Sequence, residues 1–163
     1  MTSPPSPGRR KIRMVRPGEL LADTLLLIRA APASRNEAVL DIAETALDSA
    51  DTYEVERPDG RRVVLYGASV FGRVPGVAPE DLLRRFAGSP SYLEATVREV
   101  RSSGFDVVPT GANPDHFDLL LIDGRSPDQP LLSLAEVELA ARRLVEVCGQ
   151  LHPNPSYAGG GHG

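Results

Sequence analysis

The sequence has no tryptophan, only one cysteine and no long apolar run. Cys148 has no second cysteine to pair with, which excludes an internal disulfide and fits a reducing compartment. No stretch approaches the roughly 20 apolar residues that a membrane-spanning helix needs. The basic residues before residue 17 are not followed by the apolar segment of a secretory signal. We therefore expect a cytoplasmic protein with no membrane contact.

Lysine is nearly absent as well, since all of the 18 basic residues except Lys11 are arginines. This bias is typical of GC-rich coding and indicates a high-GC bacterium. The 163 residues, 41% of them hydrophobic and 25% charged, match one globular domain with its own core.

The net charge of −4 is unevenly distributed, because the residues before position 17 are basic or uncharged. The remainder of the chain is therefore acidic, which disfavours a nucleic-acid groove. A nucleic-acid accessory role that uses the basic tail is the weakest of three functional hypotheses.

Composition also sets the expected domain limits. Residues 1–16 are rich in proline, serine and arginine, and residues 150–163 end in a glycine-rich run. Neither segment can bury enough apolar surface to offset the entropy of the chain. We predict disordered tails over 1–16 and 150–163 and a single α+β domain over 17–149.

Three serines that stand three residues before a glutamate mark expected helix starts. The pairs are Ser34 with Glu37, Ser91 with Glu94, and Ser133 with Glu136. In such a capping box the two side chains bond to free amides at the helix start. Apolar residues follow at helical spacing in each case. A shorter helix is expected from Pro79, since proline suits a first turn.

Apolar and β-branched runs predict five strands, over residues 24–30, 53–57, 61–71, 105–110 and 116–122. Turn formers at 58–60 and 111–115 favour antiparallel hairpins. The order of elements predicts a mostly antiparallel five-stranded sheet with helices packed against it.

Arg29 stands near the end of the apolar strand 24–30. A guanidinium can lie in such a strand only if acceptors meet its five N–H donors. Strand alternation places it on the same side as Leu25 and Leu27. It is either a clamp for a carboxylate or phosphate, or a strand-end arginine that reaches solvent or pairs with a nearby acid.

Ser69 belongs to a run of small residues, Gly67-Ala68-Ser69, that interrupts a strand. Such a run marks a bulge or a close approach by a ligand or a packed helix. The glycine pattern of a serine-hydrolase nucleophile is missing.

His116 opens the last strand and is expected opposite Thr110 across a hairpin. Histidine can serve there as an acid, a base or a ligand contact, or as a structural contact between strands. Cys148, His152 and His162 lack the spacing of zinc ligands, so no metal site is expected.

Arg29 in Leu-Ile-Arg-Ala, Ser69 in Ala-Ser-Val-Phe and Glu138 in Glu-Val-Glu occur in the order arginine, serine, paired glutamate. In this order the chain resembles mono-ADP-ribosyltransferase toxin domains. The resemblance implies NAD as cofactor, held by the arginine, with the serine supporting the nicotinamide pocket and the second glutamate orienting the ribose. The chain departs from the family in having Ala-Ser-Val for Ser-Thr-Ser and in placing Glu-Val-Glu at an expected helix start.

The chain also resembles small uncharacterised α+β proteins of high-GC bacteria, through Ile28-Arg29, Ser69-Val70-Phe71, Pro109-Thr110 and His116-Phe117. That resemblance implies no activity. We expect a non-catalytic binding module without a cofactor, for a partner protein or a small anionic ligand, with Arg29, Thr110 and His116 as contacts. The alternative is an NAD-dependent transferase with Arg29, Ser69 and Glu138 as catalytic residues.

Overall fold

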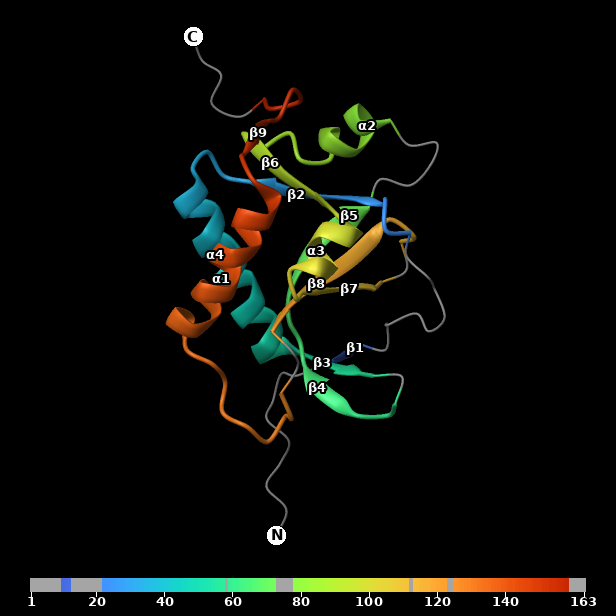
Figure 1. The fold of residues 1–163 in the computed structure, drawn as a ribbon, viewed down its shortest axis with the longest axis vertical. Helices are drawn as coiled ribbons and strands as arrows, with labels where there is room; N and C mark the ends of the chain where they lie inside the picture. Colours follow the sequence, from blue (N-terminus) through green and yellow to red (C-terminus); the bar gives the residue numbers. More distant parts are fainter. Residues whose placement is uncertain are drawn as a thin grey trace.

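The computed structural model of this protein describes residues 10–12, 22–57, 59–72, 78–111, 113–122 and 125–158. Figure 1 shows the arrangement of its helices and strands. In chain order these are β1 (Arg10–Ile12), β2 (Leu26–Ala31), α1 (Arg35–Thr52), β3 (Tyr53–Glu56), β4 (Arg62–Val64), β5 (Tyr66–Gly72), α2 (Pro79–Arg84), β6 (Ser91–Thr96), α3 (Val97–Ser102), β7 (Asp106–Pro109), β8 (His116–Ile122), α4 (Leu134–Cys148) and β9 (His152–Pro153).

The main sheet has six strands in the order β7-β8-β5-β2-β6-β9, and all its neighbours are antiparallel. The α+β class and the antiparallel sheet are therefore confirmed. The sheet has six strands instead of the expected five, because neither β6 nor β9 was expected as a strand and the expected strand 53–57 lies outside this sheet. A second sheet, β1-β3-β4, has β1 parallel to β3 and β3 antiparallel to β4.

The expected strand 61–71 is two strands that belong to different sheets. β4 pairs with β3 in the small sheet, whereas β5 pairs with β8 and β2 in the main sheet. Leu65 lies between them, and its N–H bonds to the carbonyl of Tyr53. A continuous apolar pattern does not reveal such a change of partner, since both strands are largely buried.

Helices α1 and α4 lie side by side on one face of the main sheet (Figure 1). Alanines at Ala43, Ala46 and Ala50 of α1 are fully buried, which lets the helix approach the sheet closely. The apolar side chains of both helices join those of the sheet in the largest core cluster. On the other face, Leu82 and Leu83 of α2 pack with Ile28.

The helix starts at Ser34 and Ser133 are confirmed, whereas the one at Ser91 is wrong. Ser91–Thr96 is strand β6, with buried and half-buried residues in strict alternation. The capping box lies five residues later, where Thr96 and Glu99 bond to each other's main-chain N–H at the start of α3. Ser91 and Glu94 have the spacing of a capping box, but the chain between them pairs with β2.

Part of each expected tail belongs to the fold. Residues 10–12 form β1, while the other positions of 1–16 lie outside the described residues. Residues 150–158 are described, and Asn154 in this segment is only 6% exposed. The prediction of disorder from residue 150 is therefore wrong for 150–158, because main-chain hydrogen bonds hold a segment that has little apolar surface.

Candidate functional site

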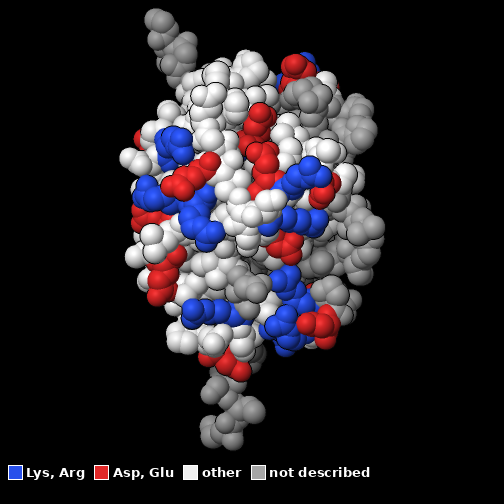
Figure 2. Space-filling model, viewed as in Figure 1, with Lys and Arg blue, Asp and Glu red and all other residues white. Residues whose placement is uncertain are grey.

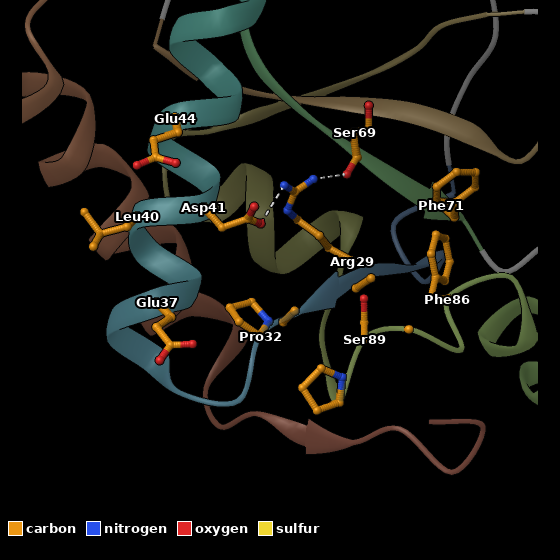
Figure 3. A pocket seen from close by; sticks show the side chains of 14 residues that line it. Arg29, Pro32, Glu37, Leu40, Asp41, Glu44, Ser69, Phe71, Phe86 and Ser89 are labelled. Carbon is orange, nitrogen blue, oxygen red and sulfur yellow. Dashed lines mark hydrogen bonds and ion pairs between the residues drawn. The ribbon is translucent and has the colours of Figure 1, made fainter. Parts of the chain in front are cut away.

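The Arg29 side chain projects from β2 and lies between helix α1 and strand β5 (Figure 3). Its side chain is 14% exposed. The Nη1 atom donates to the main-chain oxygen of Ser69 at 2.7 Å, and Nη2 donates to Asp41 Oδ2 at 3.0 Å and to Thr45 Oγ1 at 3.2 Å. Strand alternation predicted that Arg29 shares a side with Leu27, and in the structure this side faces α1, a helix that was expected to pack against the sheet.

The hydrogen bond to Ser69 exists because β2 and β5 separate at this point. The two strands pair at Leu27 with Gly72 and at Ile28 with Phe71, and no pair is formed beyond these. From Arg29 onward β2 pairs with β6 alone, whereas β5 continues along β8. Among the described strands none lies beside this edge of β5 beyond Phe71, and the main-chain groups there need other partners.

Side chains supply those partners. The Ser69 carbonyl accepts from Arg29, and the Gly67 carbonyl accepts from Ser49 Oγ at 3.2 Å. A polar stripe on α1 with a spacing of four residues runs along this edge: Asp41, Thr45 and Ser49. The small residues at 67–69 thus mark the place where a helix replaces a strand, which was one of the two interpretations of this run.

Arg29 is not fully satisfied by these contacts. Its Nε atom is enclosed and has no hydrogen-bond partner among the described residues. An unpaired buried donor is unfavourable by about 1–3 kcal/mol. Arg29 thus pairs with a nearby acid, as one of the two sequence interpretations expected, and it also borders a cavity.

That cavity, which we call the Arg29 pocket, is open to solvent and has a volume of about 650 Å³. In Figure 3 helix α1 forms one side, and Phe71 and Phe86 lie on the other with ring centroids 5.1 Å apart. The pocket is lined by Arg29, Ala30, Ala31, Pro32, Glu37, Leu40, Asp41, Glu44, Ser69, Phe71, Phe86, Gly88, Ser89 and Pro90.

Acidic side chains outnumber basic ones around the Arg29 pocket. Arg29 is the one basic residue among those that line it, and Asp41 already pairs with it. Glu37 and Glu44 are exposed on α1. Figure 3 shows Glu44 directed away from Arg29, at the outer rim. The pocket is therefore neutral at its centre and negative at its rim.

The wall opposite α1 is held by the C-terminal segment. Asn154 Nδ2 donates to the carbonyls of Phe86 and Ser89, both at 3.0 Å. The Asn154 N–H bonds to the Pro90 carbonyl at 2.9 Å, and the Ala158 N–H bonds to the carbonyl of Ala87 at 2.8 Å. The sequence analysis missed Asn154 because it placed this residue in a tail, although an asparagine among prolines is a common turn former.

Thr110 and His116 meet as predicted, but apart from the Arg29 pocket and with a third partner. Thr110 Oγ1 donates to Asp118 Oδ2 and lies 3.0 Å from His116 Nδ1. The hydroxyl proton is used on the carboxylate, so Thr110 Oγ1 meets Nδ1 as an acceptor, and the Thr110 carbonyl also lies 3.2 Å from Nδ1. Sequence reasoning missed Asp118, which lies within an apolar strand and is 6% exposed.

Phe71 contacts both the Arg29 pocket and the cluster of Thr110, His116 and Asp118. Its ring packs against His116 edge to face at a centroid distance of 5.4 Å and also borders the Arg29 pocket. Thr110, His116 and Asp118 are not among the residues that line this pocket. The cluster therefore supports the aromatic wall from behind.

Only two of the three residues implied by the transferase resemblance come together. Arg29 and Ser69 both line the pocket, but Ser69 offers its main-chain carbonyl to Arg29. Glu138 lies on α4, where it bonds to Arg142 at 3.0 Å, and is not among the residues that line the pocket. Within the described residues, no group of three His, Cys, Asp or Glu side chains is arranged to hold a metal ion.

Comparison with protein-family models, with curated proteins and with solved structures found no match to this chain. No helix in the described part of the chain has the length and apolar character needed to cross a membrane.

Proposed function

We propose that this protein is a non-catalytic binding module and that the Arg29 pocket receives a segment of a partner protein. The observation that carries this proposal is a concave site that joins an aromatic wall to exposed carboxylates around an arginine already neutralised by Asp41. Pockets of several hundred cubic ångströms with a mainly apolar wall and a few polar groups are the usual form of a binding site.

A partner segment explains the pocket better than a small anion does. Arg29 already uses three hydrogen bonds on groups of the fold. An anion would compete with Asp41 for Arg29 and would meet Glu37 at the same mouth, where like charges repel. A protein segment instead gains from the apolar wall and leaves the ion pair intact.

The transferase and nucleic-acid hypotheses have less support. Glu138 is paired on α4 and does not line the pocket. Figure 2 shows basic and acidic side chains interspersed over the face in view, with no broad region of one sign. A nucleic-acid interface relies on a continuous basic surface.

An array of immobilised random octapeptides, probed with the fluorescently labelled protein, tests the proposal. We expect a subset of peptides to bind. Gly88→Leu should abolish their binding, because Gly88 lines the pocket, a Cβ atom added there has no other atom within 4 Å, and the larger side chain would occupy the space of the peptide. A matched pair compares two exposed leucines: Leu40→Ser at the pocket should weaken binding, whereas Leu139→Ser on α4 should not. An array without binders, or binding that survives Gly88→Leu, would refute the proposal.

A further inference from the structure

We infer that the partner segment is an extended peptide with a basic side chain, and that its main chain bonds to Ala30 and Ser69. This inference rests on the proposed function, and it names the ligand class of the same pocket. It is carried by the interrupted ladder between β2 and β5 and by the charge of the rim.

The direction of the main-chain groups follows from contacts on both strands. The Leu25 carbonyl accepts a hydrogen bond from the N–H of Val97, the residue after β6. The main-chain N–H and C=O groups of every second residue from Leu25 therefore point toward β6. Those of every second residue from Leu26, which include Ala30, point toward β5. On β5, the carbonyls of Gly67 and Ser69 both point to the side away from β8. Ala30 and Ser69 would therefore be the next hydrogen-bonded pair after Ile28 and Phe71.

This pair is not formed, although both residues line the Arg29 pocket. Arg29 takes the Ser69 carbonyl, so the pocket presents main-chain groups that a regular ladder would have used. An extended peptide offers N–H and C=O groups at the spacing of a ladder and can replace the missing partner. Peptide recognition at an open sheet edge works in this way, with the main chain supplying affinity and the side chains supplying specificity.

The rim indicates which side chains the peptide carries. Glu37 and Glu44 are exposed on α1, and within the described residues neither carboxylate pairs with a basic side chain. A lysine or arginine on the peptide would complement them. Alternate side chains of an extended peptide point to opposite sides, so an apolar neighbour can contact Phe71 and Phe86 while the basic group reaches α1.

Fluorescence polarisation with a labelled, end-capped hexapeptide of alternating valine and arginine tests the inference on the full chain. The two comparison probes are the valine–glutamate hexapeptide and the valine–arginine hexapeptide with N-methylated amides. We expect the valine–arginine probe to bind. Each comparison probe should bind about tenfold more weakly or worse, since the loss of one hydrogen bond or ion pair of about 1.4 kcal/mol has this effect.

A double variant tests the charge of the rim. Glu37→Gln combined with Glu44→Gln should weaken the binding of the valine–arginine probe and reduce the salt dependence of this binding. The unfolding midpoint should change only slightly, because both side chains are exposed and, of the two charges lost, only that of Glu37 lies in the first turn of α1.

The outcomes separate this inference from the proposed function. Equal binding of the N-methylated probe would overturn the main-chain contacts with Ala30 and Ser69. Tighter binding of the valine–glutamate probe, or array binders without basic residues, would overturn the basic class while the pocket remained a peptide site. Failure of all three probes together with an empty array would refute the binding module itself.

Discussion

Arg29 Nη1 lies 2.7 Å from the main-chain oxygen of Ser69, on a strand that has already separated from β2. The side chain of one strand thereby replaces a main-chain hydrogen bond of the other. Because β5 stays paired with β8, the separation opens the sheet on one side only. The Arg29 pocket lies at that opening, so the same contact that closes the edge of β5 also shapes the candidate binding site.

Arg29→Met should lower the free energy of unfolding by about 1–3 kcal/mol, because it leaves the Ser69 carbonyl without its partner. Asp41→Asn should lower it by less than about 1 kcal/mol, since a pair with a solvent-exposed partner contributes little. The Asp41 side chain is 46% exposed, against 14% for Arg29. Urea denaturation measures both variants. An Asp41→Asn loss as large as that of Arg29→Met would show that the ion pair, and not the bond to Ser69, dominates.

Gly72→Ala should destabilise the fold by about 1–3 kcal/mol, because overpacking a filled core forces neighbours to move. A Cβ atom on Gly72 would lie 2.4 Å from Phe117 Cε2 and 3.2 Å from Leu25 Cδ2. Gly88→Ala is the matched control, since a Cβ there meets nothing within 4 Å. The control should be neutral in the same thermal or urea unfolding experiment. Equal effects of the two substitutions would contradict the packing of Phe117 on Gly72.

Asn154→Ala should loosen the pocket wall opposite α1, since the carbonyls of Phe86 and Ser89 lose their shared donor. Hydrogen exchange at residues 86–90 should become faster, and peptide binding should weaken. Ser156→Ala is the control, because it keeps the Ser156 N–H that bonds to Asn154 Oδ1. Unchanged exchange at 86–90 in Asn154→Ala would show that the wall holds without this clamp.

Cys148 should make stability fall at alkaline pH. Burial, with a further contribution from Glu99, raises the pKa of its thiol from 9.0 to about 12. In the unfolded chain the thiol ionises near the ordinary pKa, so between these two values the unfolded state binds fewer protons than the folded state. The contribution of the Cys148 thiol to the free energy of unfolding is therefore complete below pH 9 and declines as the pH rises toward 12.

Urea denaturation of the native chain and of Cys148→Ala at increasing pH measures this contribution. The difference in the free energy of unfolding between the two chains should shrink above pH 9. Alkylation of the thiol should also be much faster in urea than in buffer. A constant difference across this range would contradict the raised pKa.

The outer edge of β7 should resist pairing with a second chain. The Val107 N–H bonds to Asp106 Oδ1 at 2.8 Å, the Val107 carbonyl accepts from Arg101 Nη2 at 3.4 Å, and Pro109 has no N–H. Natural sheets protect their edges with charged side chains and proline. Asp106→Ala combined with Arg101→Ala should therefore promote self-association in light scattering at high concentration. Arg98→Ala, which removes an exposed pair between α3 and Asp23, is the control and should remain unchanged.

Local signals in the sequence identified much of the secondary structure. Ser34 and Ser133 mark the starts of the two long helices, because a capping side chain acts on amides only two or three residues away. The hairpins at 58–60 and 111–115 follow from turn chemistry in the same way. Strand alternation also placed Arg29 on the same side of the strand as Leu27, and the structure shows that this side faces α1.

Nonlocal pairing decided the rest. Ser91 and Glu94 have the spacing of a capping box, yet this segment forms β6 because β2 offers it a complete ladder. The division of 61–71 between two sheets, and the addition of 152–153 to β6, depend in the same way on partners far along the chain.

By itself the sequence determined the α+β class, the hairpins, both long helices and an arginine that needs acceptors. Only the tertiary structure decided which acceptors Arg29 meets, that Asp118 joins Thr110, and that Asn154 holds a pocket wall. The physical reason is that capping and alternation act over a few residues, whereas the point at which two strands separate depends on the packing of the whole sheet against α1.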